Sequence, residues 1–326
     1  MVVTVVGNYP KTPNLPRPQM LRRAINQFDR GEIEREELVE VENQVTREVI
    51  DEQVEAGVEL VTDGMIRWDD GQTYLAGGLD GFSINGLIRY FDNNTYYRQP
   101  VAEGPIRWKE PITVDDYRFA ASHSPVPVKP VLTGPYTLAR LSQIGEGREF
   151  AEVLRELAHA LNQEARALSE AGATLVQFDE PSILEDGSEV GLFAEAAQTL
   201  VEGLDAQTAL YTYFGDAGTI WAQVESLPFD LIGLDFVSGP ANYDLIADRF
   251  PKDKLLGAGV VDGRNTRLEE PDEVAKALER VSAHVPMERL HVNPSCGLDF
   301  LPREVAETKL QRLSEGAGLA QGRSAG

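Results

Sequence analysis

The sequence predicts an α/β protein built as a single (β/α)8 TIM barrel, and three observations support this fold. Short runs rich in β-branched residues alternate with longer amphipathic segments along the chain, as in a parallel sheet wrapped by helices. No glycine-rich dinucleotide loop or switch point, which an open sheet would carry, interrupts the alternation. Polar residues follow nearly every predicted strand, at the end where a barrel places its active site.

The predicted elements follow one another along the whole chain. Strands are expected at residues 2–7, 59–63, 128–133, 174–179, 208–213, 230–236, 255–261 and 290–293. Helices are expected between nearly all of them, most clearly at 35–56, 147–171, 191–204, 272–284 and 303–316. In the first of these helices, Leu38, Val45 and Val49 recur at helical spacing with acidic residues between them. That pattern is typical of an amphipathic helix on a protein surface.

One segment breaks this rhythm. Residues 71–127 follow the second predicted strand and are rich in Gly, Asn, Tyr and Pro. A connection of this length is typically a functional lid or a small hairpin layer, because long structureless loops are uncommon in compact domains. We therefore predict one domain, residues 1–317, with an irregular excursion at 71–127. Residues 318–326, rich in small and polar side chains, are expected to form a disordered tail.

The composition argues against several classes of partner and location. The formal net charge of −23 disfavours binding to nucleic acid or to acidic membranes, because both are polyanions. No stretch of about 18 apolar residues occurs, so no membrane-spanning helix is expected. The N-terminus has neither the basic region nor the cleavage site of a signal peptide. Cys296 is the only cysteine, which excludes an intrachain disulfide and predicts a cytoplasmic location.

Polar residues at the predicted strand ends indicate a pocket for a small-molecule substrate. Asp179 and Glu180 end the fourth strand. Successive strand residues face opposite sides, so one carboxylate is expected in the pocket and the other at the barrel rim. A structural alternative is that the pair only precedes a helix, because the next residue, Pro181, fixes a helical φ. Cys296 follows the last strand in a turn, where we expect a functional thiol, although a lone cysteine also packs as a small buried side chain.

Taken in order, these motifs resemble the catalytic domain of cobalamin-independent methionine synthase. The likeness runs through Gly7-Asn8-Tyr9-Pro10, Thr133-Gly134-Pro135, Asp179-Glu180-Pro181 and Asn293-Pro294-Ser295-Cys296-Gly297. The resemblance implies a TIM barrel that transfers a methyl group to the sulfur of homocysteine. It also implies a zinc ion, held by His, Cys, Glu and Cys, that binds this sulfur as the thiolate.

The residues at the implied zinc site differ from the family pattern. The resemblance places Tyr211 and Tyr213 where the family has a His-x-Cys pair, and Asp235 where it has Glu. Neutral tyrosine, with a pKa of about 10, is a poor zinc ligand. Asp235 and the retained Cys296 are thus an incomplete set, because a catalytic zinc normally has three protein ligands. The four residues Asp179, Tyr211, Tyr213 and Cys296 are the predicted catalytic residues.

The implied homocysteine site differs as well. Asn8 stands where the family has serine, and Met65 where it has the glutamate that contacts the substrate ammonium. Loss of such a carboxylate weakens selectivity for an amino acid, by about 2–5 kcal/mol where the pair is buried. Asp179, the other family contact to the amino acid, is retained. Further substrate-binding candidates at the strand ends are Arg67, Glu180 and Asn293.

Three functions remain open from the sequence. The first is a methyltransferase acting on homocysteine or a related thiol. The family's N-terminal barrel, which helps to bind methyltetrahydrofolate polyglutamate, is absent from this sequence, so methylcobalamin or a corrinoid protein is the expected donor. The second is a zinc-free lyase or decarboxylase, in which Arg67, Arg98 or Arg264 holds a small anion and Tyr211 or Tyr213 donates a proton. The third is a non-catalytic relative that keeps the barrel.

Overall fold

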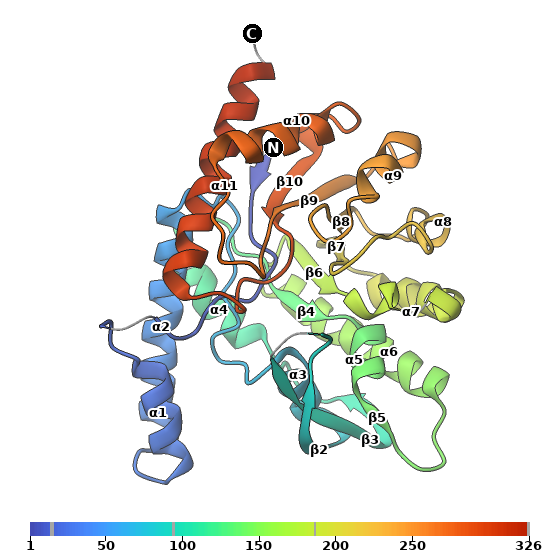
Figure 1. The fold of residues 1–326 in the computed structure, drawn as a ribbon. Coiled ribbons are helices and arrows are strands. Elements are labelled where there is room, and N and C mark those ends of the chain that lie inside the picture. Colours follow the sequence, from blue (N-terminus) through green and yellow to red (C-terminus); the bar gives the residue numbers. More distant parts are fainter. Residues whose placement is uncertain (14–15, 93–94, 186, 325–326) are drawn as a thin grey trace.

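The computed structural model describes residues 1–13, 16–92, 95–185 and 187–324. Its centre is a curled parallel sheet of seven strands (Figure 1). These strands are β1 (Val2–Val3), β4 (Val131–Thr133), β6 (Leu175–Asp179), β7 (Gln207–Tyr211), β8 (Leu231–Asp235), β9 (Leu255–Val261) and β10 (Leu290–Pro294). Their order in the sheet is β1-β10-β9-β8-β7-β6-β4. Because all seven run parallel, their carboxyl ends meet at one edge of the sheet.

The second predicted strand, at 59–63, is not a strand of this sheet. It contributes two isolated parallel bridges, Leu60 to Thr4 and Val61 to Val128. The side-chain amide of Gln53 accepts from the N–H of Thr62 at 3.1 Å and donates to the carbonyl oxygen of Thr62 at 3.0 Å. Both backbone groups of Thr62 are thereby withdrawn from a ladder. The other seven predicted strands are confirmed, the first shortened to β1, and closure into an eight-stranded barrel stays a prediction.

Helices cover the outside of the sheet (Figure 1), as the amphipathic segments predict. The α-helices are α1 (Met20–Asp29), α2 (Arg35–Glu55), α5 (Pro135–Leu141), α6 (Phe150–Glu170), α7 (Val190–Val201), α8 (Trp221–Val224), α9 (Asn242–Arg249), α10 (Pro271–Ser282) and α11 (Arg303–Ser324). Short 3-10 turns are η1 (Pro181–Leu184), η2 (Gly187–Glu189) and η3 (Met287–Arg289). The five clearest predicted helices correspond to α2, α6, α7, α10 and α11. In α6, Leu154, Leu157 and Leu161 are buried on one face, which packs the helix on the core.

The C-terminal segment corrects the sequence prediction. α11 includes residues 318–324, which were expected to be disordered, and residues 325–326 lie outside the described part of the chain. Ala320 is fully buried. A Cβ at Gly316 would lie 2.5 Å from Cβ of Val274 on α10. Gly316 therefore lets α11 lie close to α10, and the segment expected to be disordered continues this helix with Ala320 buried.

The predicted excursion forms an ordered layer beside the central sheet (Figure 1). It comprises α3 (Gly71–Gly77), β2 (Leu79–Arg89), β3 (Tyr96–Trp108) and α4 (Val114–His123), and β5 (Gln143–Ile144) joins the hairpin in a sheet of order β2-β3-β5. The hairpin layer is confirmed and the expectation of irregular structure is wrong. Gly81 shows why the composition misled: it has φ +90° at a register shift, and a Cβ there would lie 2.5 Å from the carbonyl oxygen of Pro105. Residues 93–94 lie outside the described residues.

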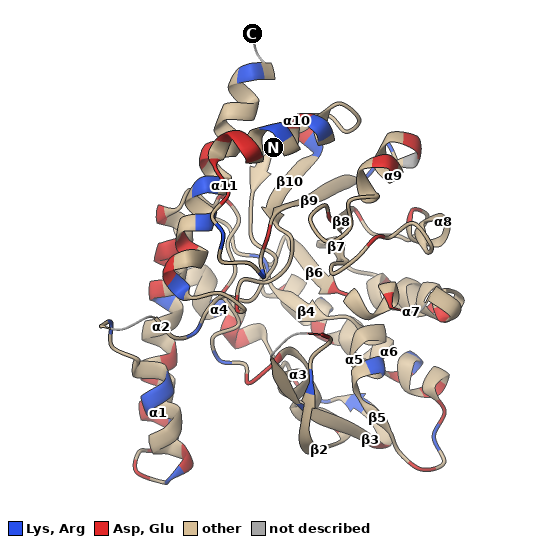
Figure 2. Cartoon of the chain, viewed as in Figure 1, with Lys and Arg blue, Asp and Glu red and all other residues tan. Residues whose placement is uncertain are grey.

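Charged residues lie mainly on the outer elements. Figure 2 shows acidic residues on most of the outer helices rather than in one stretch of the chain. This distribution fits a solvated acidic surface, as the net charge of −23 predicts. Within the described ranges, no helix has both the length and the apolar character needed to cross a membrane.

Candidate active site

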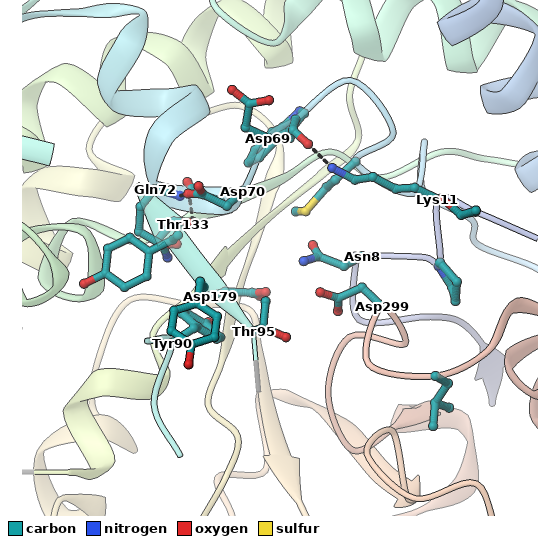
Figure 3. A pocket seen from close by; sticks show the side chains of 18 of the residues that line it. Asn8, Lys11, Asp69, Asp70, Gln72, Tyr90, Thr95, Thr133, Asp179 and Asp299 are labelled. Carbon is teal, nitrogen blue, oxygen red and sulfur yellow. Dashed lines mark hydrogen bonds between the residues drawn. The ribbon is translucent and has the colours of Figure 1, made fainter. Parts of the chain in front are cut away.

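A cavity of about 380 Å³ lies at the carboxyl ends of the central strands, where the sequence predicts a pocket (Figure 3). The ends of β4 and β6 and the segments after β1, β7 and β10 form one part of its wall, and residues 65–70, α3 and the β2–β3 hairpin form the rest. Four predicted site residues line it, namely Asn8, Met65, Asp179 and Tyr213. The structure thus brings together residues that are far apart in the sequence.

Asp179 is the central polar residue of this cavity. It is the last residue of β6, and its two carboxylate oxygens accept hydrogen bonds from β6 itself and from the segment after β7. Nε2 of Gln177 donates to Oδ1 at 2.7 Å, and the hydroxyl of Tyr213 donates to Oδ2 at 3.2 Å. Burial raises the pKa of Asp179 to about 7, and these hydrogen bonds and the Lys129 ammonium oppose that rise. The carboxylate is therefore poised to change charge near neutral pH.

Tyr211 lies one layer deeper and does not line the cavity. A Cβ at Gly233 would lie 2.3 Å from Cδ1 of its ring, and a Cβ at Gly257 would lie 2.7 Å from its hydroxyl. Glycines on β8 and β9 therefore make the room that this ring fills. Its hydroxyl donates to Oδ1 of Asn293 at 3.3 Å, in the interior enclosed by the curled sheet. Tyr211, expected as a catalytic residue, and Asn293, expected as a substrate contact, therefore contact each other in the core and do not line the cavity.

Glu180 faces away from the cavity, as the alternation along β6 predicts for one of the two carboxylates. It accepts from the backbone N–H of Tyr136 at 2.9 Å and of Thr137 at 2.6 Å. These are orphan donors of the first turn of α5. Gly134 is required beside it, because a Cβ there would lie 2.3 Å from the Glu180 carboxyl. Glu180 therefore stabilises the start of α5 at the rim and does not line the cavity in which substrate binding was expected.

The predicted arginine clamp is not present at the cavity. Arg67 is directed toward α4, where its Nε lies 3.5 Å from Asp116 and its guanidinium lies 4.8 Å from the ring centre of Phe119. Arg264 pairs with Asp92 at 3.0 Å. Arg98 is exposed on β3 and does not line the cavity. The lyase or decarboxylase hypothesis loses the anion-binding groups on which it depended.

The candidate metal ligands do not form a zinc site. The carboxylate of Asp235 accepts hydrogen bonds from the backbone N–H groups of Phe214, Val237 and Ser238, at 2.8–3.1 Å. Cys296 is fully buried, and burial raises the pKa of its thiol well above the usual value, so the thiolate that zinc prefers is disfavoured. No group of three or more His, Cys, Asp and Glu side chains that could hold a metal occurs in the described part of the chain. The residues present therefore do not fit the zinc ion that the family resemblance implies.

Several lining residues were missed by sequence reasoning. Lys11 is the only Lys or Arg among the described residues that line the cavity, and its Nζ donates to the carbonyl oxygen of Trp68 (Figure 3). Asp299 lies beside Asn8 in the same figure, and its Oδ1 is buried without a hydrogen-bond partner. Both residues follow strand-end motifs that the sequence did identify. Tyr90, from the hairpin, carried no signal beyond the unusual composition of the excursion.

The chain is similar to known proteins along nearly its whole length. The family model for the catalytic domain of cobalamin-independent synthase matches residues 1–318. Methionine synthase from Saccharolobus solfataricus is 34% identical over 321 residues, which cover 98% of this chain and 94% of that protein. Methionine synthase from Sulfurisphaera tokodaii is 33% identical over 319 residues, covering 98% and 92%.

A solved structure supports the fold. The B12-independent methionine synthase from Shewanella sp. W3-18-1, in complex with selenomethionine, superposes with a TM-score of 0.86 at 22% identity, covering 99% of this chain and 98% of that one. The matched family is described as independent of cobalamin, so the expected methylcobalamin donor and corrinoid partner are not supported. The resemblance seen in the sequence is confirmed: the chain belongs to the cobalamin-independent methionine synthase catalytic-domain family, whose members are methyltransferases.

Proposed function

We propose that this chain transfers a methyl group to the sulfur of homocysteine and so forms methionine. The relatives that match nearly the whole chain are named methionine synthase. The observation that carries the proposal is Asp179, a carboxylate in the cavity wall whose charge is supported by Gln177 and Tyr213. Such a carboxylate in an enclosed pocket is complementary to the ammonium group of an amino acid.

Lys11 supports the opposite end of the same substrate. Its ammonium uses one donor on the carbonyl oxygen of Trp68. A lysine ammonium has three donors, so two remain for the α-carboxylate of the amino acid. Lys11 then holds the carboxylate and Asp179 the ammonium, which orients the thiol within the cavity.

The donor in this proposal is a methyltetrahydrofolate, because the family acts without cobalamin. Trp68, Tyr90 and Tyr97 line the cavity. Aromatic side chains stack against planar heterocycles, so these rings provide a surface for the pterin ring of the donor. Apolar surface around the methyl group also excludes water from the transfer.

Asp299 is the proposed base for the thiol. A thiol reacts as its thiolate, and the buried Oδ1 of Asp299 is free to accept a proton. Burial raises the pKa of this carboxyl, which brings it nearer to the pKa of a thiol. Asp299 takes the thiol proton while the sulfur bonds to the methyl carbon. The bond from that carbon to the donor nitrogen breaks, its electron pair stays on the nitrogen, and the proton passes from Asp299 to that nitrogen.

The test is a methyl-transfer assay with the purified chain. L-Homocysteine is supplied with 5-methyltetrahydrofolate, as the monoglutamate and the triglutamate, and methionine is measured by mass spectrometry. Asp179→Asn is expected to raise KM for homocysteine, and Asp299→Asn to lower kcat by about 10²-fold or more. Asp230→Asn is the control, because Asp230 accepts from the Thr208 N–H just before β8, at the opposite end of the barrel. No methionine with either donor contradicts the proposal.

A further inference from the structure

We propose that Lys129 is a positioning residue for Asp179: its buried ammonium, acting through Gln177, keeps the carboxylate ionised and aimed into the cavity. The inference rests on the proposed function in one respect, namely that Asp179 receives the substrate ammonium. Lys129 itself does not line the cavity. It therefore acts through another side chain and touches neither substrate nor donor.

The location of Lys129 is unusual for a lysine. Its side chain is only 1% exposed, whereas lysines are almost never fully buried unless they are paired. Nζ donates to Oε1 of Gln177, and it lies 4.9 Å from the ring centre of Tyr211. No carboxylate lies within ion-pair distance of Nζ among the described residues. The charge is thus held by an amide, an aromatic face and the field of Asp179.

Gln177 links the ammonium to the carboxylate. A glutamine amide has one accepting and one donating end, and an ammonium can only donate. Because Lys129 occupies Oε1, the Nε2 end must face the other way, where it donates to Oδ1 of Asp179 and to the carbonyl oxygen of Val6, both at 2.7 Å. Lys129 therefore fixes the orientation of the amide. An amide fixed in this way presents N–H groups to Asp179, which favours its ionised form.

The other titratable groups around Lys129, Gln177 and Asp179 do not supply a positive charge. His291, on β10, faces Lys129, and burial lowers the pKa of His291 to about 4, so it is neutral near pH 7. Tyr90, Tyr211 and Tyr213 are neutral as well, because burial raises the pKa of each hydroxyl.

Negatively charged neighbours make the ionised form of Asp179 more dependent on the Lys129 ammonium. Asp299 and Cys296 face Tyr90 and Tyr213 from the segment after β10, and a carboxylate at Asp299 adds to the negative field in the cavity. Burial opposes ionisation of both partners: it raises the pKa of Asp179 and lowers that of Lys129, and with their mutual attraction included each pKa is about 7. Each charge therefore depends on the other, and removal of one destabilises the other.

The first experiment replaces the charge. Lys129→Met removes the ammonium, and Lys129→Gln keeps a donor for Gln177 without charge. The pKa of Asp179 is read by NMR of ¹³C-carboxyl-labelled aspartate, with the resonance assigned by its loss in Asp179→Asn. Both variants are expected to raise the pKa of Asp179. KM for homocysteine at pH 7 then rises roughly tenfold for each unit by which this pKa exceeds the assay pH, recovers at higher pH, and kcat at saturation stays the same.

Lys254→Met is the matched control. Lys254 is also a buried lysine, but it stands just before β9 and donates to the carbonyl oxygens of Leu227 and Phe229, which precede β8, at the amino ends of the central strands. Its loss is expected to lower stability without moving the pKa of Asp179. If Lys129 had a purely structural role, Lys129→Met, Lys129→Gln and Lys254→Met would all lower stability and leave the pKa of Asp179 unchanged. That outcome overturns the inference.

A reciprocal measurement avoids variants at Lys129 altogether. Asp179→Asn is expected to lower the pKa of Lys129, followed through ¹³Cε of labelled lysine, because the carboxylate that raises it is gone. An unchanged Lys129 pKa in this variant also overturns the inference. Both titrations need no turnover, so a chain that makes no methionine would refute the proposed function and still give a result here.

Discussion

The hydroxyl of Tyr213 donates to Oδ2 of Asp179 at 3.2 Å, and this bond joins the segment after β7 to the end of β6. Tyr213 stands at a position where the family resemblance implies a zinc-binding cysteine. In this chain the same position supports a carboxylate that lines the cavity. A change that looks like the loss of a ligand is thus also the gain of a hydrogen bond inside the pocket.

Tyr213→Phe is expected to weaken binding of homocysteine. The substitution removes one hydrogen bond to the Asp179 carboxylate, worth about 0.5–1.5 kcal/mol, or roughly two- to tenfold in KM. Steady-state kinetics at pH 7 measures this effect. Tyr211→Phe is the control, because it removes the same hydroxyl one layer deeper, where the partner is Asn293. That variant should lower the free energy of unfolding and leave KM unchanged; equal KM values for the two variants would argue against the pairing of Tyr213 with Asp179.

Activity is expected to fall on the acid side of neutrality. Burial raises the pKa of Asp179 to about 7, and only the ionised carboxylate attracts an ammonium group. kcat/KM for homocysteine should therefore drop about tenfold for each pH unit below this pKa. A profile that stays flat between pH 5 and pH 8 in the wild-type protein would contradict the assignment of Asp179.

The Asp179 carboxyl also makes the free energy of unfolding depend on pH. Its folded pKa of about 7 lies above the unfolded value of about 3.9, so folding favours the protonated form. Its stabilising contribution is complete below the unfolded pKa and is lost as the pH rises through about 7. Asp179→Asn, which is neutral throughout, should therefore lose less Tm than the wild type when the pH is raised from 3.5 to 8.

An exposed aspartate provides the control of opposite sign. Hydrogen bonds from Lys276 and Arg323 lower the pKa of Asp272 to about 2. Asp272→Asn should cost stability at neutral pH, and this cost should vanish as the pH falls through the folded pKa. Calorimetry of both variants across the pH range separates the two cases.

Metal content tests the misfit of the zinc site. Because Asp235 is committed to backbone N–H groups and Cys296 is a buried neutral thiol, we expect substantially less than one zinc per chain by elemental analysis. Cys296→Ala should not change that content, and a chelator should not abolish methyl transfer. One zinc per chain that is lost in Cys296→Ala would show that these two residues recruit other ligands.

Glu180→Gln is expected to act on stability rather than on substrate binding. Glutamine can accept from only one of the two backbone N–H groups that Glu180 now satisfies at the start of α5. The other buried donor is left without a partner, which costs about 1–3 kcal/mol in the free energy of unfolding. Urea denaturation at pH 8 measures this loss. A raised KM with unchanged stability would instead place Glu180 in the binding site.

Much of the fold could be read from the sequence because it depends on local patterns. Alternating β-branched and amphipathic segments predicted seven of the observed strands and the outer helices. The prediction of a strand at 59–63 was wrong because the side chain of Gln53 takes the backbone hydrogen bonds of Thr62. No local sequence pattern reveals this contact. The prediction of a disordered tail was wrong because small residues have two meanings. In an isolated segment they indicate disorder, but beside a second helix they allow close packing.

The sequence by itself determined which strand ends meet and that only one of two adjacent carboxylates could enter the pocket, because side chains alternate along a strand. It could not determine how deep below the cavity each side chain lies. Tyr211 and Tyr213 share one face, yet Tyr211 fills the interior of the curled sheet against Gly257 and Tyr213 reaches the cavity. Only the tertiary structure decided this, and only it brought Lys11 and Lys129 within reach of their partners, because the curl of the sheet and the path of the loops set which side chains share a dry interior.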